Sequence, residues 1–280
     1  GSDNSIIVHG VPFNKLKADS FIFTYSESYN KILGGENANK NNIIEGTSSN
    51  DWIQGSPHFL DKSGDGVNYF FPNEGDDILV SDSIRIYDYV GSDPKDTYFT
   101  NNYFINSTGK KTIVGFSARS SEYFNPNTKH MLDRIFFEKR STNYLSDLTI
   151  SFDEDGFINL LPDNDVTVKL HSITEGFVDT ANIVLHDPIE NYIYGTRDDD
   201  ILTGTSGNDY IDGWGEYNSG GGSPCFGIES GDDILEGKEG NDVLVGGVST
   251  HFCGGYNRDI FRFAENSGQD VIVDFTSNFE

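Results

Sequence analysis

The 280-residue sequence is poor in basic residues, in methionine and in long apolar stretches. It holds one Met, two Cys and two Trp, and hydrophobic residues make up 35% of the chain, a low share for a globular protein. No stretch approaches the roughly 20 apolar residues that a membrane-spanning helix needs. Asn, Gly, Ser and Thr are abundant, so the composition favours strands and loops over helices.

The shortage of basic residues leaves a formal charge of −26, from 45 acidic and 19 basic residues. Such a chain repels nucleic acid and anionic membrane, so we expect neither as a partner. The acids could simply solvate the surface, or cations could neutralise them on folding. Scattered acids fit the first explanation, whereas acids at a fixed spacing fit the second.

Sequence motifs of common enzymes are also lacking. None of the six His stands in HExxH, and neither a GxSxG elbow nor a GxxxxGK phosphate loop occurs. Carboxylates are too numerous for a catalytic pair to be excluded by counting. We nevertheless expect a protein that is not an enzyme, and we assign no catalytic residue.

Nine-residue repeats are what the sequence does contain. GTRDDDILT at 195–203 is followed directly by GTSGNDYID at 204–212, and GDDILEGKEGNDVLVGG occupies 231–247. Gly, Asp and an aliphatic residue return in phase, as at Asp233 and Asp242. This is the nonapeptide pattern of calcium-binding parallel β-helices.

Each position of the repeat has a physical role. Glycines allow a tight turn whose carbonyl groups can face inward. The Asp supplies a hard anionic oxygen, which suits Ca²⁺ with its six to eight oxygen ligands. The short strand contributes one large apolar side chain, and only the stacking of neighbouring coils turns these side chains into a core.

With these repeats the chain resembles the RTX, or haemolysin-type calcium-binding, family of type I-secreted proteins. The resemblance spans 195–275 and includes RDIFRF at 258–263 and GQDVIVDF at 268–275, which look like a closing strand pair. It implies a parallel β-roll with several Ca²⁺ ions between its turns. It also implies a monomer within a larger RTX protein, located outside the cell, secreted or on the bacterial surface.

Metal-ligating residues are expected in the turns. In the C-terminal repeats these are Asp200, Gly207, Asn208, Asp209, Gly231, Asp232, Asp233, Gly240, Asn241 and Asp242. GTSSNDWIQ at 46–54 and EGDDILVSD at 74–82 read as an eroded earlier copy, which adds Asp51 and Asp77. We therefore hypothesise an internal duplication.

An insert at 56–73 separates these two N-terminal turns. It contains DKSGDG at 61–66, in which Asp61 and Asp65 match the first half of an EF-hand loop. Pro72 takes the place of the final Glu, so a complete EF-hand is excluded. A lone calcium site and an Asx-rich turn both fit this stretch.

Two further inserts, 214–230 and 248–253, interrupt the C-terminal repeats, and each carries one cysteine. In an extracellular setting we expect a disulfide between Cys225 and Cys253, although two buried free thiols are the alternative. Trp214, Tyr217 and Phe226 stand among glycines, as in a recognition loop. The same aromatic residues, like YFFP at 69–72, could instead cover the core.

Between the two sets of repeats, 117–190 alternates apolar and polar residues with period two. We expect antiparallel strands there, with DEDG at 153–156 as a hairpin turn. The predicted fold is all-β, with a C-terminal parallel β-roll, a degenerate N-terminal roll-like segment, and a mainly antiparallel β-layer or small sandwich. Two domains follow, 1–190, with its partial copy at about 43–82, and 191–280.

The function expected from these features is calcium-dependent binding of an extracellular glycan or peptide, as in a bacterial adhesin. The roll would be the scaffold and the inserts would contact the ligand. The alternative is a calcium-folded accessory or secretion module of a larger secreted enzyme, such as a polysaccharide-modifying enzyme, lipase or protease. Inserts favour the first function, because an accessory roll needs no additional loops.

Overall fold

The chain is almost entirely built of short β-strands, as the composition predicts. The structure is a computed structural model. It describes residues 29–34, 42–55, 66–81, 99–116, 133–140, 144–154, 157–174, 182–196, 198–213, 216–218, 227–229, 231–247 and 258–274. In these ranges the helical structure is one 3₁₀ turn, Leu145–Asp147. No helix among them has the length and apolar character of a membrane span.

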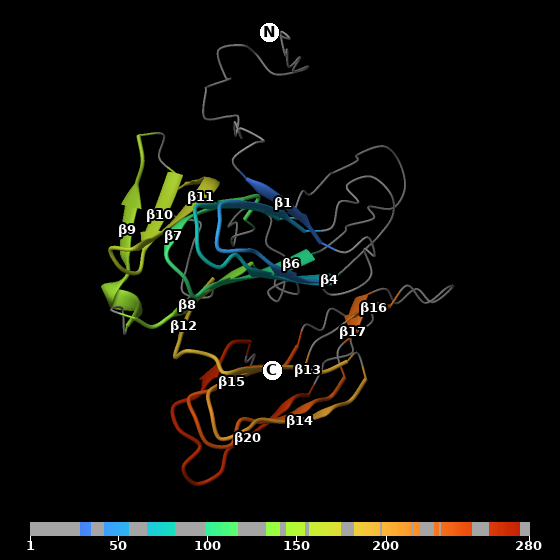
Figure 1. Cartoon of the computed structure of the whole chain (residues 1–280). Coiled ribbons are helices and arrows are strands. Elements are labelled where there is room, and N and C mark those ends of the chain that lie inside the picture. The colour runs from blue at the N-terminus through green and yellow to red at the C-terminus, as the bar shows by residue number, and fades with distance from the viewer. Residues whose placement is uncertain are drawn as a thin grey trace.

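The chain up to His186 winds between two sheets, here called the N-terminal roll (Figure 1). Sheet A has the order β1 (Asn30–Leu33), β3 (Asp51–Gln54), β5 (Asp77–Val80), β7 (Gly109–Val114), β11 (Val166–Thr174), β10 (Phe157–Leu161) and β9 (Thr149–Phe152). Sheet B has the order β12 (Ile183–His186), β8 (Arg134–Glu138), β6 (Phe99–Ile105), β4 (Gly66–Phe71) and β2 (Asn42–Glu45). From β1 to β8 successive strands alternate between the sheets, so neighbours within a sheet run parallel.

The chain crosses from sheet B to sheet C between His186 and Asn191, and it then winds a second time. Sheet C has the order β13 (Asn191–Tyr194), β15 (Asp209–Asp212), β19 (Val243–Val245) and β21 (Val271–Ile272). Sheet D has the order β14 (Ile201–Thr203), β18 (Ile234–Glu236) and β20 (Ile260–Arg262). All pairs in these two sheets are parallel, which confirms the predicted C-terminal β-roll.

The predicted antiparallel layer is confirmed only in part. Strands β9, β10 and β11 form an antiparallel meander, and its first turn falls at the predicted 153–156. Strands β8 and β12 instead pair in parallel with each other, and β8 also pairs in parallel with β6. Period-two alternation reports which faces of a strand are buried and carries no information about strand direction.

The insert assigned to 56–73 is shorter than expected, because residues 66–71 form strand β4 of sheet B. The aromatic side chains of this strand are buried, with Tyr69 and Phe70 both fully covered. For the aromatic stretch at 69–72 the core-covering alternative is therefore the right one. Asp61 and Asp65 lie outside the described residues.

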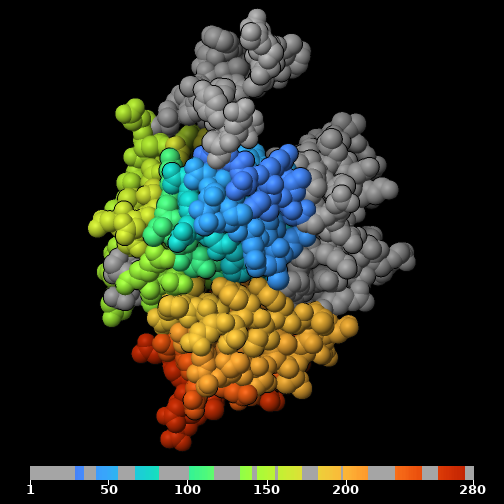
Figure 2. Space-filling view, in the orientation of Figure 1, coloured from blue at the N-terminus to red at the C-terminus, as the bar shows by residue number. Residues whose placement is uncertain are grey.

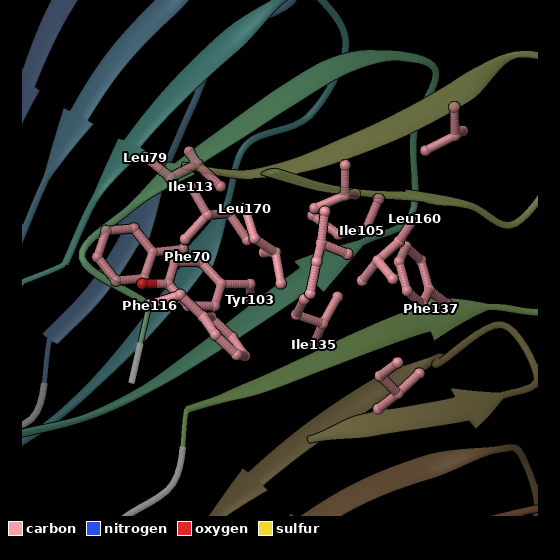
Figure 3. Packing of buried hydrophobic residues seen from close by; sticks show 14 of the residues in the cluster. Phe70, Leu79, Tyr103, Ile105, Ile113, Phe116, Ile135, Phe137, Leu160 and Leu170 are labelled. Carbon is pink, nitrogen blue, oxygen red and sulfur yellow. The ribbon is translucent and has the colours of Figure 1, made fainter. Parts of the chain in front are cut away.

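Hydrophobic clusters fill the spaces between successive sheets. Phe70 and Tyr103 belong to the cluster between sheets A and B, which Figure 3 shows in close-up. Phe104 meets Tyr210 in the cluster between sheets B and C. Leu235 packs in the cluster between sheets C and D. Since side chains alternate along a strand, sheet B is buried on both faces and the sheets stack in the order A, B, C, D.

A buried carboxylate ties the two rolls together. The Tyr69 hydroxyl of sheet B and the Tyr210 hydroxyl of sheet C each donate to Oδ2 of Asp212, both at 2.8 Å. Burial, reinforced by this carboxylate, raises the pKa of both tyrosines, so both hydroxyls remain proton donors. Figure 2 shows the C-terminal roll in direct contact with the N-terminal one along this junction.

Candidate calcium sites in the turns

A column of one asparagine and three aspartate side chains runs across the turns that lead into sheet C. Asn191, Asp209, Asp242 and Asp270 stand at equivalent positions of successive coils. Each carboxylate uses Oδ1 to bind the coil before it. The Asp209 amide donates to Asp242 at 2.8 Å, and the Asp242 amide donates to Asp270 at 3.1 Å. Every second repeat therefore places its aspartate in the same column, one coil after the last.

A second column runs across the turns that lead into sheet D. The Asp200 amide donates to Oδ1 of Asp233 at 2.9 Å, and the Asp233 amide donates to Oδ1 of Asp259 at 3.1 Å. The pattern of amide-to-Oδ1 hydrogen bonds is the same as in the first column, and the insert at 214–230 lengthens one coil of each column. An insert can enter a coil without disturbing the column, because the strands on either side keep their register.

The carboxylates inside the columns have oxygens to spare. Oδ2 of Asp233 and Oδ2 of Asp242 are buried and have no hydrogen-bond partner. A buried anionic oxygen without a partner is costly, and a divalent cation would remove that cost. Asp200 and Asp209 differ, because their own turns bind them: the Thr196 and Thr205 amides donate to Oδ2 at 2.6 and 2.5 Å.

Glycines make room for these oxygens. A Cβ atom at Gly237 would lie 2.0 Å from Oδ2 of Asp242, and one at Gly213 would lie 2.3 Å from Oδ2 of Asp233. Gly240, with φ of 122°, lies against the carbonyl of Gly207 in the coil before it. Gly231 likewise lies against the backbone of Asp198. The predicted glycines therefore allow the close approach of coils that a shared cation requires.

Burial also perturbs the acids of both columns. It raises the pKa of Asp233 to about 7, of Asp242 to about 6 and of Asp259 to about 7, and neighbouring carboxylates add to each shift. Burial likewise raises the pKa of Asp270. Closely spaced buried carboxylates resist ionisation unless a cation compensates them. The electrostatics of the turns thus fit the uptake of Ca²⁺.

In three other predicted ligands, Oδ1 accepts a hydrogen bond from the backbone of the next coil. Asn208 accepts from the Asn241 amide at 2.8 Å, and Asn241 accepts from the Gln269 amide at 2.8 Å. Asp232 accepts from the Arg258 amide at 3.0 Å. These side chains bind one coil to the next, whether or not their carbonyl groups also face a cation.

The oxygen atoms available in the turns, carboxylates together with backbone carbonyls, are of the kinds that calcium binds. Among the described residues no group of three or more His, Cys, Asp or Glu side chains converges on one point. Asp233 and Asp242 would each hold the ion through Oδ2, and backbone carbonyls of the turns would have to complete the six to eight oxygens.

The N-terminal copy repeats the geometry of the first column. The side-chain Nδ2 of Asn30 donates to Oδ1 of Asp51 at 2.9 Å, just as Nδ2 of Asn191 donates to Oδ1 of Asp209 at 2.8 Å. The Asp51 amide donates to Oδ1 of Asp77 at 2.9 Å. The two predicted N-terminal aspartates therefore lie in a column like that of sheet C, which agrees with the duplication hypothesis.

The predicted recognition loop and disulfide are mostly outside the described residues: Trp214, Cys225, Phe226 and Cys253 all are. Tyr217 lies in β16 (Glu216–Asn218), which pairs antiparallel with β17 (Gly227–Glu229) opposite Ile228. The insert at 214–230 thus contains a β-hairpin.

Sequence reasoning missed several members of the columns. Asp259 and Asp270 are each one residue before a strand, in RDIF and QDVI, and a count of residues back from the aliphatic positions would have found them. Lys111 lies opposite Asp77 in the pairing of β5 with β7 and so takes the next position of the N-terminal column. It carries no comparable signal, since a lysine is not expected at a position of the aspartate column.

The stacked coils and their columns define a parallel β-roll whose turns are built to hold divalent cations. Comparison with protein families agrees: residues 37–57, 190–219 and 229–249 match the RTX calcium-binding nonapeptide repeat, in four copies. These segments are RTX repeats, as the resemblance predicted. Such repeats are calcium-binding modules of secreted proteins and are generally non-catalytic. A comparison with curated proteins gave no match.

Proposed function

We propose that this chain is a calcium-dependent, extracellular ligand-binding module of a larger secreted or cell-surface bacterial protein. Its roll serves as the scaffold, and its inserts recognise a glycan or a peptide in adhesion. The observation that carries the proposal is the hairpin β16–β17, which interrupts a coil whose flanking strands keep their register. The hairpin forms a separate two-stranded sheet outside the four stacked sheets, and a coil of the roll needs no such addition.

The positions of the inserts support a shared binding surface. The insert at 214–230 begins after Gly213, and the one at 248–253 begins after Gly247. The Gly213 amide donates to the Val245 carbonyl at 2.8 Å, so the two inserts leave neighbouring coils at one edge of the roll. This proximity also supports the proposed Cys225–Cys253 disulfide.

Calcium controls this surface because it controls folding of the roll. Several calcium ions, including those at Asp233 and Asp242, neutralise the charge of the columns and hold neighbouring coils together. Binding energy of this kind is folding energy, since the unfolded chain has no site. The inserts are therefore arranged for binding only at the high calcium concentrations found outside cells.

The test is a glycan and peptide array probed with the intact chain in calcium and in chelator. A matched variant replaces 214–230 by Thr-Ser, the two residues that the preceding repeat has at 205–206, which restores the five-residue step from Gly213 to Asp233. We expect binding that chelation abolishes and that the shortened variant lacks, although it still gains β signal with calcium. Equal binding by both chains would refute a role for the hairpin. No binding by either would favour the accessory module of a secreted enzyme.

Calcium affinity tests the site residues separately. Asp233→Ala and Asp242→Ala should each shift the folding midpoint to higher calcium, with Mg²⁺ as the ion control. Asp153→Ala should leave the midpoint unchanged, because Asp153 pairs with Lys169 at 2.5 Å, away from the columns. Equal shifts in all three variants would show that the ligand assignment is wrong.

A further inference from the structure

The turn before Asp77 in the N-terminal roll has the same backbone shape as the turn before Asp242 in the C-terminal roll. Four and two residues before each aspartate, φ is positive. The values are 60° at Asn73 and 113° at Gly75, against 75° at Lys238 and 122° at Gly240. The two turns are therefore equivalent sites, and their contents can be compared atom by atom.

The two sites differ in what faces the aspartate. Oδ2 of Asp242 has no partner, and the next coil contributes Asp270 at the equivalent position. Oδ2 of Asp77 lies 2.8 Å from the ammonium group of Lys111, which takes the place of that next aspartate. One column ends on a carboxylate and the other on a cation.

The Lys111 ammonium group is surrounded by oxygens as a metal ion would be. It donates to the carbonyl oxygens of Asn73 at 2.7 Å, Gly75 at 2.6 Å and Thr108 at 3.0 Å, besides its ion pair with Asp77. Both charged side chains are fully buried. Burial raises the pKa of Asp77 to about 6, and the nearby ammonium group opposes this shift. Turn carbonyls and one carboxylate are also the ligands that calcium prefers.

At its other edge, too, the N-terminal roll has groups that need no calcium where the C-terminal roll has carboxylates. Where sheet D has the aspartate column, sheet B has asparagines. Asn42 donates to Asn68 at 2.9 Å, and Asn68 donates to Asn101 at 3.0 Å. Asn101 in turn donates to Asp133 at 2.9 Å. An amide carries both a donor and an acceptor, so such a ladder satisfies itself with no cation.

We propose that the N-terminal roll holds its turns together with Lys111 and the asparagine ladder in the positions where the C-terminal roll takes calcium, and that it therefore folds without calcium. A tethered ammonium group cannot dissociate, and neutral amides need no compensating charge. At Asp77 the expected calcium ligand is thus already paired. The N-terminal roll then offers the buried face of sheet B as a permanent base on which the C-terminal roll docks once calcium binds.

Hydrogen exchange of the intact chain, followed by mass spectrometry, measures each roll separately. In chelator we expect amides of 204–213 and 231–247 to exchange at least about tenfold faster than in calcium. Amides of 66–81 and 99–116 should change by no more than about twofold. Loss of protection in both rolls to the same extent would overturn the proposal.

The role of the ammonium group is tested with Lys111→Ala against Lys110→Ala. Lys110 is the exposed neighbour of Lys111. In chelator Lys111→Ala should lose protection over 66–81 and 99–116, and calcium should restore it, since the vacated turn keeps its carboxylate and carbonyls. Lys110→Ala should match the wild type. Identical exchange in the two variants would show that Lys111 has no such role.

Discussion

Removing one hydroxyl at the junction of the two rolls tests whether they form a single folded unit. Tyr69→Phe deletes the donor that Tyr69 directs at Asp212, at 2.8 Å, and keeps the ring. The ring contacts with Tyr194 and Tyr210, at centroid distances of 5.1 and 6.5 Å, therefore remain available. The change removes the buried hydrogen bond that crosses between sheets B and C.

The acceptor sets the expected magnitude. A hydrogen bond to a charged group contributes about 1.5–3 kcal/mol, against about 1 kcal/mol for a neutral pair. We expect Tyr69→Phe to lower the free energy of unfolding by about 2 kcal/mol. Tyr210→Phe should cost a similar amount, since its hydroxyl lies equally close to the same oxygen. The double variant should cost more than the sum of the two, because each hydroxyl partly compensates for the loss of the other.

Urea denaturation in saturating calcium, followed by circular dichroism, measures these differences. Tyr144→Phe is the control, because it removes the same hydroxyl group from a side chain at the surface. Tyr144 is 71% exposed. Its free energy of unfolding should stay within about 0.5 kcal/mol of the wild type. If Tyr69→Phe also stays within that range, the rolls do not depend on Asp212, and the junction is held by ring packing alone.

Two further predictions concern the turn and the pH response. Gly237→Ala places a methyl group against Oδ2 of Asp242 and should weaken calcium binding about 5- to 150-fold in a titration, since steric overlap of this kind costs about 1–3 kcal/mol. Unchanged affinity would place the ion elsewhere. Burial lowers the pKa of His186, which lies close to Lys139 and the Asp187 backbone, so the unfolded chain takes up its proton first. In calcium the wild type should therefore lose stability below about pH 6.5 more steeply than His186→Gln, and parallel urea midpoints between pH 7.5 and 5.5 would contradict this.

The repeats made the C-terminal roll predictable because all of its information is local. Gly, Asp and an aliphatic residue recur every nine residues, and each coil uses them in the same way. The interrupted coils were harder, yet Asp233 still falls in its column, since an insert lengthens the turn without shifting the strands. Period-two alternation predicted the strands of 149–174 correctly, but the antiparallel direction expected for β8 and β12 was wrong.

The pairing of Lys111 with Asp77 could not be predicted from the sequence. A lysine in KKTIV has no visible relation to Asp77, which lies 34 residues earlier. The asparagines of the ladder are likewise 26 and 33 residues apart, with no common spacing. Coils of unequal length hide such columns, because only the pairing of strands brings the members together.

The sequence by itself determined that this is an acidic, all-β chain with RTX calcium-binding turns, because each nine-residue repeat encodes one turn and one strand. Only the tertiary structure decided that the four sheets stack face to face and that Tyr69 and Tyr210 share one carboxylate. It also decided which carboxylate oxygens have no hydrogen-bond partner. Those outcomes depend on which side chains meet across coils distant in sequence, and local periodicity carries no record of them.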